Sequence, residues 1–187
     1  DVAVTGVQTC ALPISADALT VSDHLMVGRW LLERIAEEHN VVISLAAKPQ
    51  KGDWNGAGAH TNFSTKAMRA SYDAIEAACE SLSKRVDLHV KNYGHDIESR
   101  LTGKHETAPY NKFSYGVSNR GASVRIPWQV ARDRKGYAED RRPNANCDPY
   151  VVTQLLLDAV CSNEKTPAKS AAKKPAGKKA TKKAKKK

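Results

Sequence analysis

The sequence predicts an α+β fold built around a largely antiparallel sheet. Segments with a helical apolar period alternate irregularly with short strand candidates, which differs from the regular strand–helix repeat of a parallel sheet. The strand candidates are amphipathic rather than continuously apolar, as is typical of antiparallel strands with one face on a core. At 187 residues the chain is long enough for one domain with a substantial core.

The first predicted elements are a helix and a strand. A helix is expected over residues 22–39, because Ser22 or Asp23 can cap it and apolar residues follow at helical spacing. Residues 41–47 (VVISLAA) are β-branched and few, which predicts a buried strand that stops at Lys48-Pro49.

A short strand and a long helix are predicted next. Residues 61–64 have the pattern of a short strand, and Thr65 is placed to cap the helix that follows. We interpret one apolar stripe on this helix as core, with Cys79 as a small buried hydrophobe. The stripe consists of Met68, Tyr72, Ile75, Cys79 and Leu82.

The second half of the chain is turn-rich from about residue 92 to residue 113. Residues 113–126 predict two strands broken at residues 119–121, and alternation puts Val124 and Ile126 on one face with Ser123 and Arg125 on the other. A final helix is expected with Asp148 as its cap and Pro149 at its first position. The apolar positions expected along this helix are Val151, Leu155 and Val160.

The charge of +10 belongs to the end of the chain. Eleven lysines and no acid lie in residues 165–187, which leaves 19 basic against 20 acidic residues in residues 1–164. Residues 163–187 are therefore predicted to be a disordered Lys/Ala-rich tail, and residues 16–162 to be the domain. Residues 1–15 resemble a translated junction sequence and are left out of the fold prediction; the alternative is a native strand and turn.

Composition also argues against a disulfide-stabilised, a membrane-spanning and a secreted protein. The four cysteines are far apart and lack CxxC spacing, which favours reduced thiols in a cytoplasmic protein over a disulfide framework. No apolar run approaches the roughly 18 residues of a membrane span, and the start lacks the pattern of a signal peptide.

The stretch GDWNGAGAHTNFSTK, residues 52–66, is the strongest candidate for a site loop. Three glycines within seven positions suit a backbone that passes close to a ligand, and polar side chains surround them. An ordinary turn between strands is the alternative. The glycines match neither a dinucleotide-binding fingerprint nor a P-loop, and no HExxH zinc motif is present.

Five arginines and the nearby pair of Glu139 and Arg141 suggest a site for an anion and a metal. Glu139 and Arg141 are two residues apart, so in an extended segment both point to one side while Asp140 points away into structural hydrogen bonds. His60 is a candidate metal ligand. Five arginines in separate segments could hold an anionic ligand if folding gathers them, although each taken alone fits a solvated surface ion pair. These are Arg100, Arg120, Arg125, Arg141 and Arg142.

Four motifs resemble the catalytic half of a glutamine synthetase of the type II (eukaryotic-type) branch. They are GDWNGAGAHTNFSTKAMR, RLTGKHET, NRGASVRIP and GYAEDRRPNANCDPY, in that order, and the resemblance runs from about residue 22 to about residue 161. It implies a curved sheet packed with helices. It also implies an ATP-dependent ligase that forms γ-glutamyl phosphate from glutamate and then glutamine with ammonia, in a cytoplasmic homo-oligomer that uses Mg²⁺ or Mn²⁺.

The resemblance also implies roles for single residues. Glu106 would accept a proton from ammonium on a mobile flap, and Arg120 would stabilise the transferring phosphoryl group. His60 and Glu139 would bind a metal. The implied glutamate contacts are Asp53, Trp54, Asn55, Gly56, Arg100 and Arg141. The implied nucleotide contacts are Asn62, Phe63, Ser64, Arg120, Arg125 and Tyr137.

The resemblance does not include the family's N-terminal β-grasp domain or the segment with its other metal-binding glutamates. We therefore expect the 187-residue chain to be inactive by itself. Two alternatives remain: a related γ-glutamyl ligase that uses another amine, and weak nucleic-acid or other polyanion binding through the lysine tail.

Overall fold

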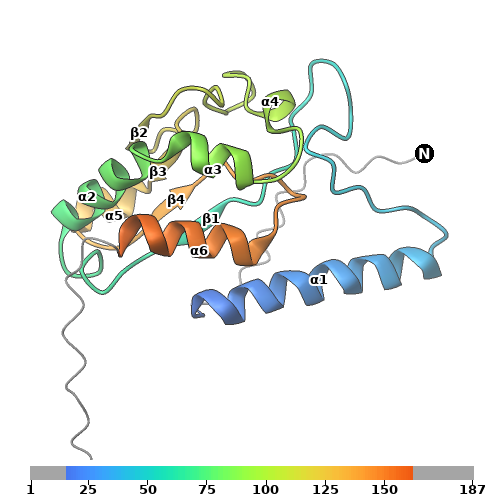
Figure 1. Cartoon of the computed structure of the whole chain (residues 1–187), viewed down its shortest axis with the longest axis horizontal. Coiled ribbons are helices and arrows are strands. Elements are labelled where there is room, and N and C mark those ends of the chain that lie inside the picture. Colours follow the sequence, from blue (N-terminus) through green and yellow to red (C-terminus); the bar gives the residue numbers. More distant parts are fainter. Residues whose placement is uncertain (1–15, 162–187) are drawn as a thin grey trace, which may run out of the picture.

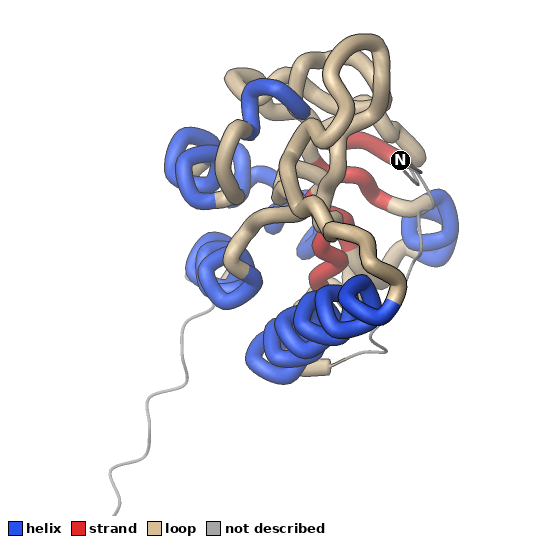
Figure 2. Tube along the Cα trace, turned by 90° about the vertical axis from the view of Figure 1, so that its right-hand side faces the viewer, coloured by secondary structure: helices blue, strands red, loops and turns tan. Residues whose placement is uncertain are grey.

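The computed structural model describes residues 16–161, in which helices surround a small sheet (Figures 1 and 2). The predicted α+β class is therefore confirmed. The predictions for residues 1–15 and for the lysine tail lie outside the described residues. The elements are α1 (Ala18–Glu38), β1 (Thr61–Phe63), α2 (Tyr72–Ser83), α3 (Val86–Asn92), α4 (Ile97–Arg100), β2 (Tyr115–Val117), β3 (Val124–Ile126), α5 (Trp128–Asp133), β4 (Ala138–Asp140) and α6 (Pro149–Val160).

The sheet has the strand order β1-β4-β3-β2. β4 pairs antiparallel with both β1 and β3, so the sheet is largely antiparallel as predicted. β2 and β3 run parallel: the Val124 amide donates to the carbonyl of Ser114 at 3.1 Å, and the Ser118 amide donates to the carbonyl of Ile126 at 2.9 Å. The two strands predicted within residues 113–126 are therefore present and adjacent.

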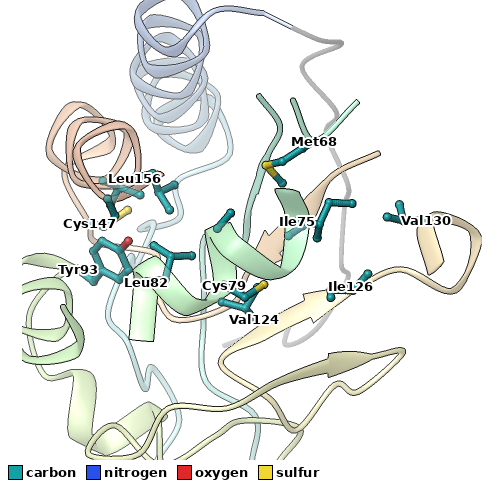
Figure 3. Close-up of a cluster of buried hydrophobic side chains, with 14 of the residues drawn as sticks. Met68, Ile75, Cys79, Leu82, Tyr93, Val124, Ile126, Val130, Cys147 and Leu156 are labelled. Atoms are coloured by element: carbon teal, nitrogen blue, oxygen red, sulfur yellow. The ribbon is translucent and has the colours of Figure 1, made fainter. Parts of the chain in front are cut away.

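The core lies between the sheet and the helices α2 and α6 (Figure 3). All five residues of the predicted stripe are buried, which confirms them as core, although Met68 lies in the turn before α2 and not on the helix. From the sheet, Val124 and Ile126 enter the same cluster, and from α6, Val152 and Leu156 do. The buried face of α6 is therefore displaced by one position from the predicted residues, which are half-buried.

Helix starts follow capping chemistry, though not always at the predicted residue. Asp148 caps α6 as expected, with its carboxylate accepting from the Tyr150 amide at 2.9 Å. α1 begins earlier than predicted because Asp17 is its cap. Ser71, not Thr65, caps α2; the Thr65 hydroxyl accepts from Met68 N in the preceding turn at 3.2 Å.

The predicted buried strand over residues 41–47 is wrong. This segment forms no strand and pairs with none within the described residues, and of its residues only Ala47 is buried. The β-branched pattern identifies a segment suited to a sheet, but a strand also needs a neighbour.

α1 lies along α6 at the side of the domain (Figure 1). The buried Ser22 hydroxyl donates to the carbonyl of α1's own Ala18 at 2.7 Å and to that of Pro149 at 3.2 Å. Arg29 donates to the carbonyls of Ala145 and Cys147 at 2.7 and 2.9 Å. No helix within residues 16–161 is long and apolar enough to cross a membrane.

Candidate functional site

The candidate site lies on the face of the sheet opposite the core. Strand pairing places Asn62 of β1 and Arg125 of β3 directly beside Glu139 of β4. Residues in register on neighbouring strands share a face, so these three side chains lie side by side. The alternate residues Ala138 and Asp140 point into the interior, as the spacing predicts.

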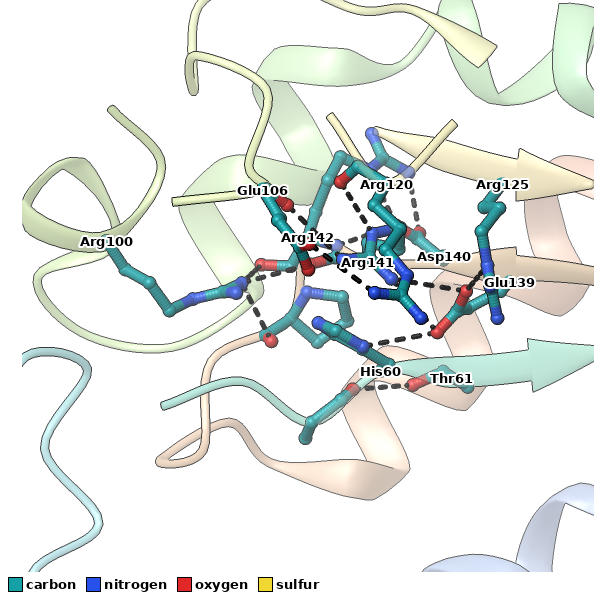
Figure 4. A network of polar contacts seen from close by, with 12 residues as sticks. His60, Thr61, Arg100, Glu106, Arg120, Arg125, Glu139, Asp140, Arg141 and Arg142 are labelled. Carbon is teal, nitrogen blue, oxygen red and sulfur yellow. Dashed lines mark hydrogen bonds and ion pairs between the residues drawn. The ribbon is translucent and has the colours of Figure 1, made fainter. Parts of the chain in front are cut away.

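Glu139 is the centre of this face (Figure 4). Its carboxylate accepts from Arg125 Nε, lies 3.3 Å from Arg141 Nη1 and lies 3.2 Å from His60 Nδ1. Burial by itself would raise the pKa of Glu139, but His60, Arg125 and Arg141 outweigh burial and lower this pKa to about 2. The carboxylate is therefore ionised at neutral pH and surrounded by cationic or donor groups.

A second acid reaches the site on the loop of residues 102–107. Arg120 Nη1 lies 3.4 Å from the Glu106 carboxylate. Arg141 links the two segments, because its Nη2 donates to the carbonyl of Glu106 at 3.2 Å and its Nε donates to the carbonyl of Arg120 at 3.1 Å. Both predicted catalytic residues, Glu106 and Arg120, therefore lie at the rim of the Glu139 cluster with exposed side chains.

The same loop contacts the Gly-rich segment. His105 Nε2 lies 3.1 Å from the Asp53 carboxylate. His105 and Glu106 both have left-handed backbones, with φ of 53° and 57°, which is an uncommon conformation for residues with a side chain. Sequence reasoning did not single out His105; its place in the polar stretch RLTGKHET was the available signal.

Behind β4, a buried ion pair anchors the strand. Arg142 Nε and Nη2 donate to the two Asp140 oxygens at 2.8 and 2.7 Å, and the Tyr93 hydroxyl donates to Asp140 at 3.0 Å. Burial would raise the pKa of Asp140, but Arg142 and these hydrogen bonds hold it below its usual value. The predicted structural role of Asp140 is confirmed, and Arg142 belongs to this network rather than to the site face.

Arg100 is also buried, at the back of the loop that follows β4. Its Nε donates to Asn144 Oδ1 at 2.6 Å, and its Nη2 donates to the carbonyls of Arg141 and Pro143 at 3.1 and 3.0 Å. Burial, followed by the nearby charge of Arg141, lowers the pKa of Arg100 to about 10, so it is charged at neutral pH. Its guanidinium is engaged by main-chain oxygens, and its contact with glutamate stays a prediction. Asn144, which holds it, was missed by sequence reasoning.

Only glycine fits at position 56 beside the buried Arg100 side chain. A Cβ there would lie 2.3 Å from Arg100 Cγ and 2.7 Å from the Ala47 carbonyl oxygen. Arg100 and Ala47 therefore account for the glycine, and the predicted approach of this backbone to a ligand stays a prediction. Trp54 and Asn55, just before it, are exposed.

The remaining predicted nucleotide contacts lie at the far end of β1. The Ser64 hydroxyl donates to the carbonyl of Gly136 at 2.7 Å, and Tyr137 is exposed beside it. Phe63 packs against the core, so its side chain points away from Asn62 and Glu139. Ser64 and Tyr137 therefore lie past the end of β1, while Asn62 and Arg125 lie beside Glu139; these positions do not test the predicted nucleotide contacts.

The donor set fits a divalent cation only in part. His60 and Glu139 converge and offer the imidazole and carboxylate that Mn²⁺ accepts, while Mg²⁺ favours the carboxylate. Within residues 16–161 no group of three or more His, Cys, Asp or Glu side chains is placed to hold a metal. Further ligands would have to come from outside the described residues.

Comparison with solved structures supports the fold. The chain resembles the structure described as "Apo GmaS without ligand" with a TM-score of 0.60 at 23% identity, covering 79% of this chain and 35% of that one. At this identity the likeness concerns the fold. No protein-family model matches the chain.

Comparison with curated proteins identifies the relatives. The chain is 71% identical over 147 residues to glutamine synthetase of Streptomyces viridochromogenes, covering 77% of this chain and 43% of that protein. It is 53% identical over 142 residues to glutamine synthetase root isozyme 1 of Zea mays, covering 75% and 40%. The chain thus spans less than half the length of these relatives, and the matched residues are homologous to part of a glutamine synthetase. Glutamine synthetases are ligases.

Proposed function

We propose that the chain is part of a glutamine synthetase of the eukaryotic-type branch, and that the whole enzyme joins ammonia to glutamate using ATP. The observation that carries this proposal is the cluster around Glu139, with His60, Arg125 and Arg141 on one carboxylate, in a segment 71% identical to a glutamine synthetase. Similarity to the proteins of Kluyveromyces lactis and Zea mays supports the choice of branch.

The arrangement of charge suits phosphoryl transfer to a carboxylate. The glutamate γ-carboxylate would attack the terminal phosphorus of ATP, giving γ-glutamyl phosphate and ADP. Arg120 would lie beside the negative charge that increases on the phosphoryl group, and Arg141, whose Nε donates to the Arg120 carbonyl, would hold a glutamate carboxylate; fixed guanidinium groups lower the energy of such charges. A divalent cation held by His60 and Glu139 would supply further neutralisation of phosphate charge when bound.

Glu106 suits the second half of the reaction. Ammonia attacks the acyl carbon, phosphate leaves, and the added nitrogen must lose a proton. The Glu106 carboxylate is exposed at the site rim, and a carboxylate there both attracts ammonium and accepts its proton. Its main chain is held by Arg141, which also contacts Glu139, so one guanidinium connects the two acids.

A chimeric enzyme tests the proposal. Residues 22–161 replace the matching segment of the S. viridochromogenes glutamine synthetase, and phosphate release is measured with and without glutamate and ammonia. Release that requires both substrates is expected, and Glu106→Gln should lower its rate by about 10²- to 10⁴-fold. Glu98→Gln, an exposed carboxylate on α4, is the matched control and should leave the rate unchanged.

Two results would overturn the proposal. One is an assembled chimera that releases no phosphate in response to glutamate and ammonia. The other is a chimera that uses ethanolamine or a polyamine in preference to ammonia, which would assign the chain to a different γ-glutamyl ligase. The 187-residue chain by itself should show no turnover, because the described residues supply only two metal ligands.

A further inference from the structure

A group of exposed basic side chains lies where the turn before α2 meets the segment between α5 and β4. The Gly136 amide donates to the Met68 carbonyl at 2.9 Å, and the Ser64 hydroxyl donates to the Gly136 carbonyl at 2.7 Å. These hydrogen bonds hold residues 64–71 beside residues 132–137. We call the exposed cations of the two segments the basic surface. They are Lys66, Arg69, Arg132, Arg134 and Lys135.

Acidic residues neutralise the basic surface only in part. Arg132 Nε lies 2.8 Å from the Asp133 carboxylate, and Arg134 Nη2 lies 3.7 Å from the Asp73 carboxylate. The other three cations form no ion pair with a residue of the range 16–161. That range carries 19 basic and 18 acidic residues, so three unpaired cations on adjoining segments are a local excess of positive charge. Such an excess attracts a ligand with several negative charges.

Aromatic rings lie beside the same cations. The Arg132 guanidinium carbon lies 5.0 Å from the centre of the Trp128 ring, and that of Arg134 lies 4.0 Å from the centre of the Tyr72 ring. Trp128 is 59% exposed at the start of α5, although tryptophan is highly buried on average. Unpaired nucleobases stack on exposed aromatic rings and on guanidinium groups, while nearby cations contact the phosphates. The combination of rings and cations therefore favours a nucleic acid over other polyanions.

The sequence after α6 adds positive charge at this end of the domain. α6 packs against α2, and its last residues lie at the same end of the molecule as the first residues of α2 (left in Figure 1). Residues 165–187 contain eleven lysines but no acidic residue, no arginine and no aromatic residue. Lysines alone attract phosphates without distinguishing paired from unpaired bases. Selectivity for unpaired bases would therefore come from the rings beside the basic surface.

We propose that the basic surface and Trp128 bind single-stranded nucleic acid. An unpaired base would stack on the Trp128 indole, and Lys66, Arg69 and Lys135 would contact the phosphates on either side. Duplex DNA fits this surface less well, because its bases are already stacked on one another. The surface shares no residue with the Glu139 cluster, so binding there does not depend on the proposed function.

The first test measures the salt dependence of binding. Fluorescence anisotropy of a labelled oligothymidylate gives its affinity for the full 187-residue chain at several salt concentrations. Each phosphate contact to a single strand contributes about 0.7 to the slope of log K against log salt, so Lys66→Gln with Lys135→Gln should reduce this slope by about 1.4. Lys91→Gln with Lys112→Gln is the matched control, because both are exposed lysines on other segments, and it should leave the slope unchanged.

The second test removes the stacking ring. Trp128→Ala should weaken binding of the oligothymidylate by about 5- to 100-fold and leave the salt slope unchanged, because it removes a base contact and no charge. Trp30→Ala is the matched control, because Trp30 is 58% exposed on α1, and it should not change the affinity. A duplex of the same length should bind more weakly than the single strand and should be insensitive to Trp128→Ala. Circular dichroism should show both variants folded, since both rings are exposed, and the lysine variants test the same surface without removing any packed side chain.

Several results would overturn the proposal. Equal effects of the surface and control substitutions would do so. Duplex binding as tight as single-strand binding, or a peptide of residues 165–187 that binds as tightly as the whole chain, would assign the interaction to the lysine tail. Complete displacement of the oligothymidylate by ATP would assign it to the predicted nucleotide contacts at Ser64 and Tyr137. An inactive chimera that still binds the oligothymidylate through Trp128 would count against the proposed function alone, and an active chimera that does not bind it would count against this surface alone.

Discussion

Acidification from pH 7 to pH 4.5 should destabilise this domain through His89. His89 is fully buried on α3, where its Nδ1 lies 3.1 Å from the Tyr93 hydroxyl and 3.0 Å from Arg142 Nη2. Burial, then the charge of Arg142, lowers the pKa of His89 to about 4, while Asp140 acts in the opposite direction. The folded domain therefore holds a neutral imidazole at pH 7.

The direction of this change in stability follows from proton binding. The ordinary pKa of histidine is 6.5, so below pH 6.5 the unfolded chain binds a proton that the folded chain excludes until about pH 4. The stability from the neutral imidazole is complete above pH 6.5 and is lost as the pH falls toward 4. Each pH unit inside this window costs up to about 1.4 kcal/mol, so by pH 4.5 the loss is about 2.5 kcal/mol.

The assay is urea unfolding followed by circular dichroism at pH 7 and pH 4.5. A loss of about 2.5 kcal/mol corresponds to a fall in Tm on the order of 5–10 °C for a domain of this size. His89→Gln cannot titrate and should lose much less stability over the same interval, although it is less stable at pH 7. His24→Gln, an exposed histidine on α1, is the control and should behave like the unchanged chain.

The reasoning is refuted if the unchanged chain and His89→Gln lose the same free energy of unfolding between pH 7 and pH 4.5. The interval is chosen to lie above the Glu139 window, because the pKa of Glu139 falls from 4.5 to about 2 on folding. Loss of stability from that carboxylate therefore begins only at more acidic pH.

Three further predictions concern the site and the core. Glu139→Gln leaves Arg125 and Arg141 without their shared anion, so the free energy of unfolding measured by urea titration at pH 7 should fall by about 1–3 kcal/mol. The difference in free energy of unfolding between this variant and the unchanged chain should shrink as the pH falls from 4.5 toward 2. A difference that stays constant over this range would contradict the prediction. Burial raises the pKa of the Cys79 thiol to about 12, so mass spectrometry should find Cys79 alkylated only in denaturant, and rapid labelling of the folded chain would contradict its burial. Gly94→Ala places a Cβ 2.3 Å from Asn146 Oδ1 at a backbone φ of +114°, so the Tm of thermal unfolding should drop by several degrees. Gly28→Ala is the control: a Cβ at Gly28 has no atom within 4 Å, so this substitution should not lower the Tm.

Much of the local structure follows from the sequence alone. The stripe that continues along α2 depends on a repeat of one helical turn, and the Asp148 cap of α6 depends on residues within one turn; both are present. The alternation at Glu139, Asp140 and Arg141 likewise follows from the period of an extended chain. The local pattern also singled out Glu139, His60 and the arginines, whereas Glu106 was named only through the resemblance to glutamine synthetases.

Tertiary structure decided which of these residues meet. Arg100 and Arg141 have the same chemistry and similar polar surroundings in the sequence, yet Arg141 joins Glu139 while Arg100 is bound to carbonyls behind the same loop. The contact of Asp53 with His105 likewise joins segments 52 residues apart. Residues 41–47 carry a strand pattern but lack a partner within the described residues. The periodicity of the sequence predicts on which side of a helix or strand a residue lies. Which residue it contacts depends on the neighbouring element, and that element comes from a distant segment of the chain.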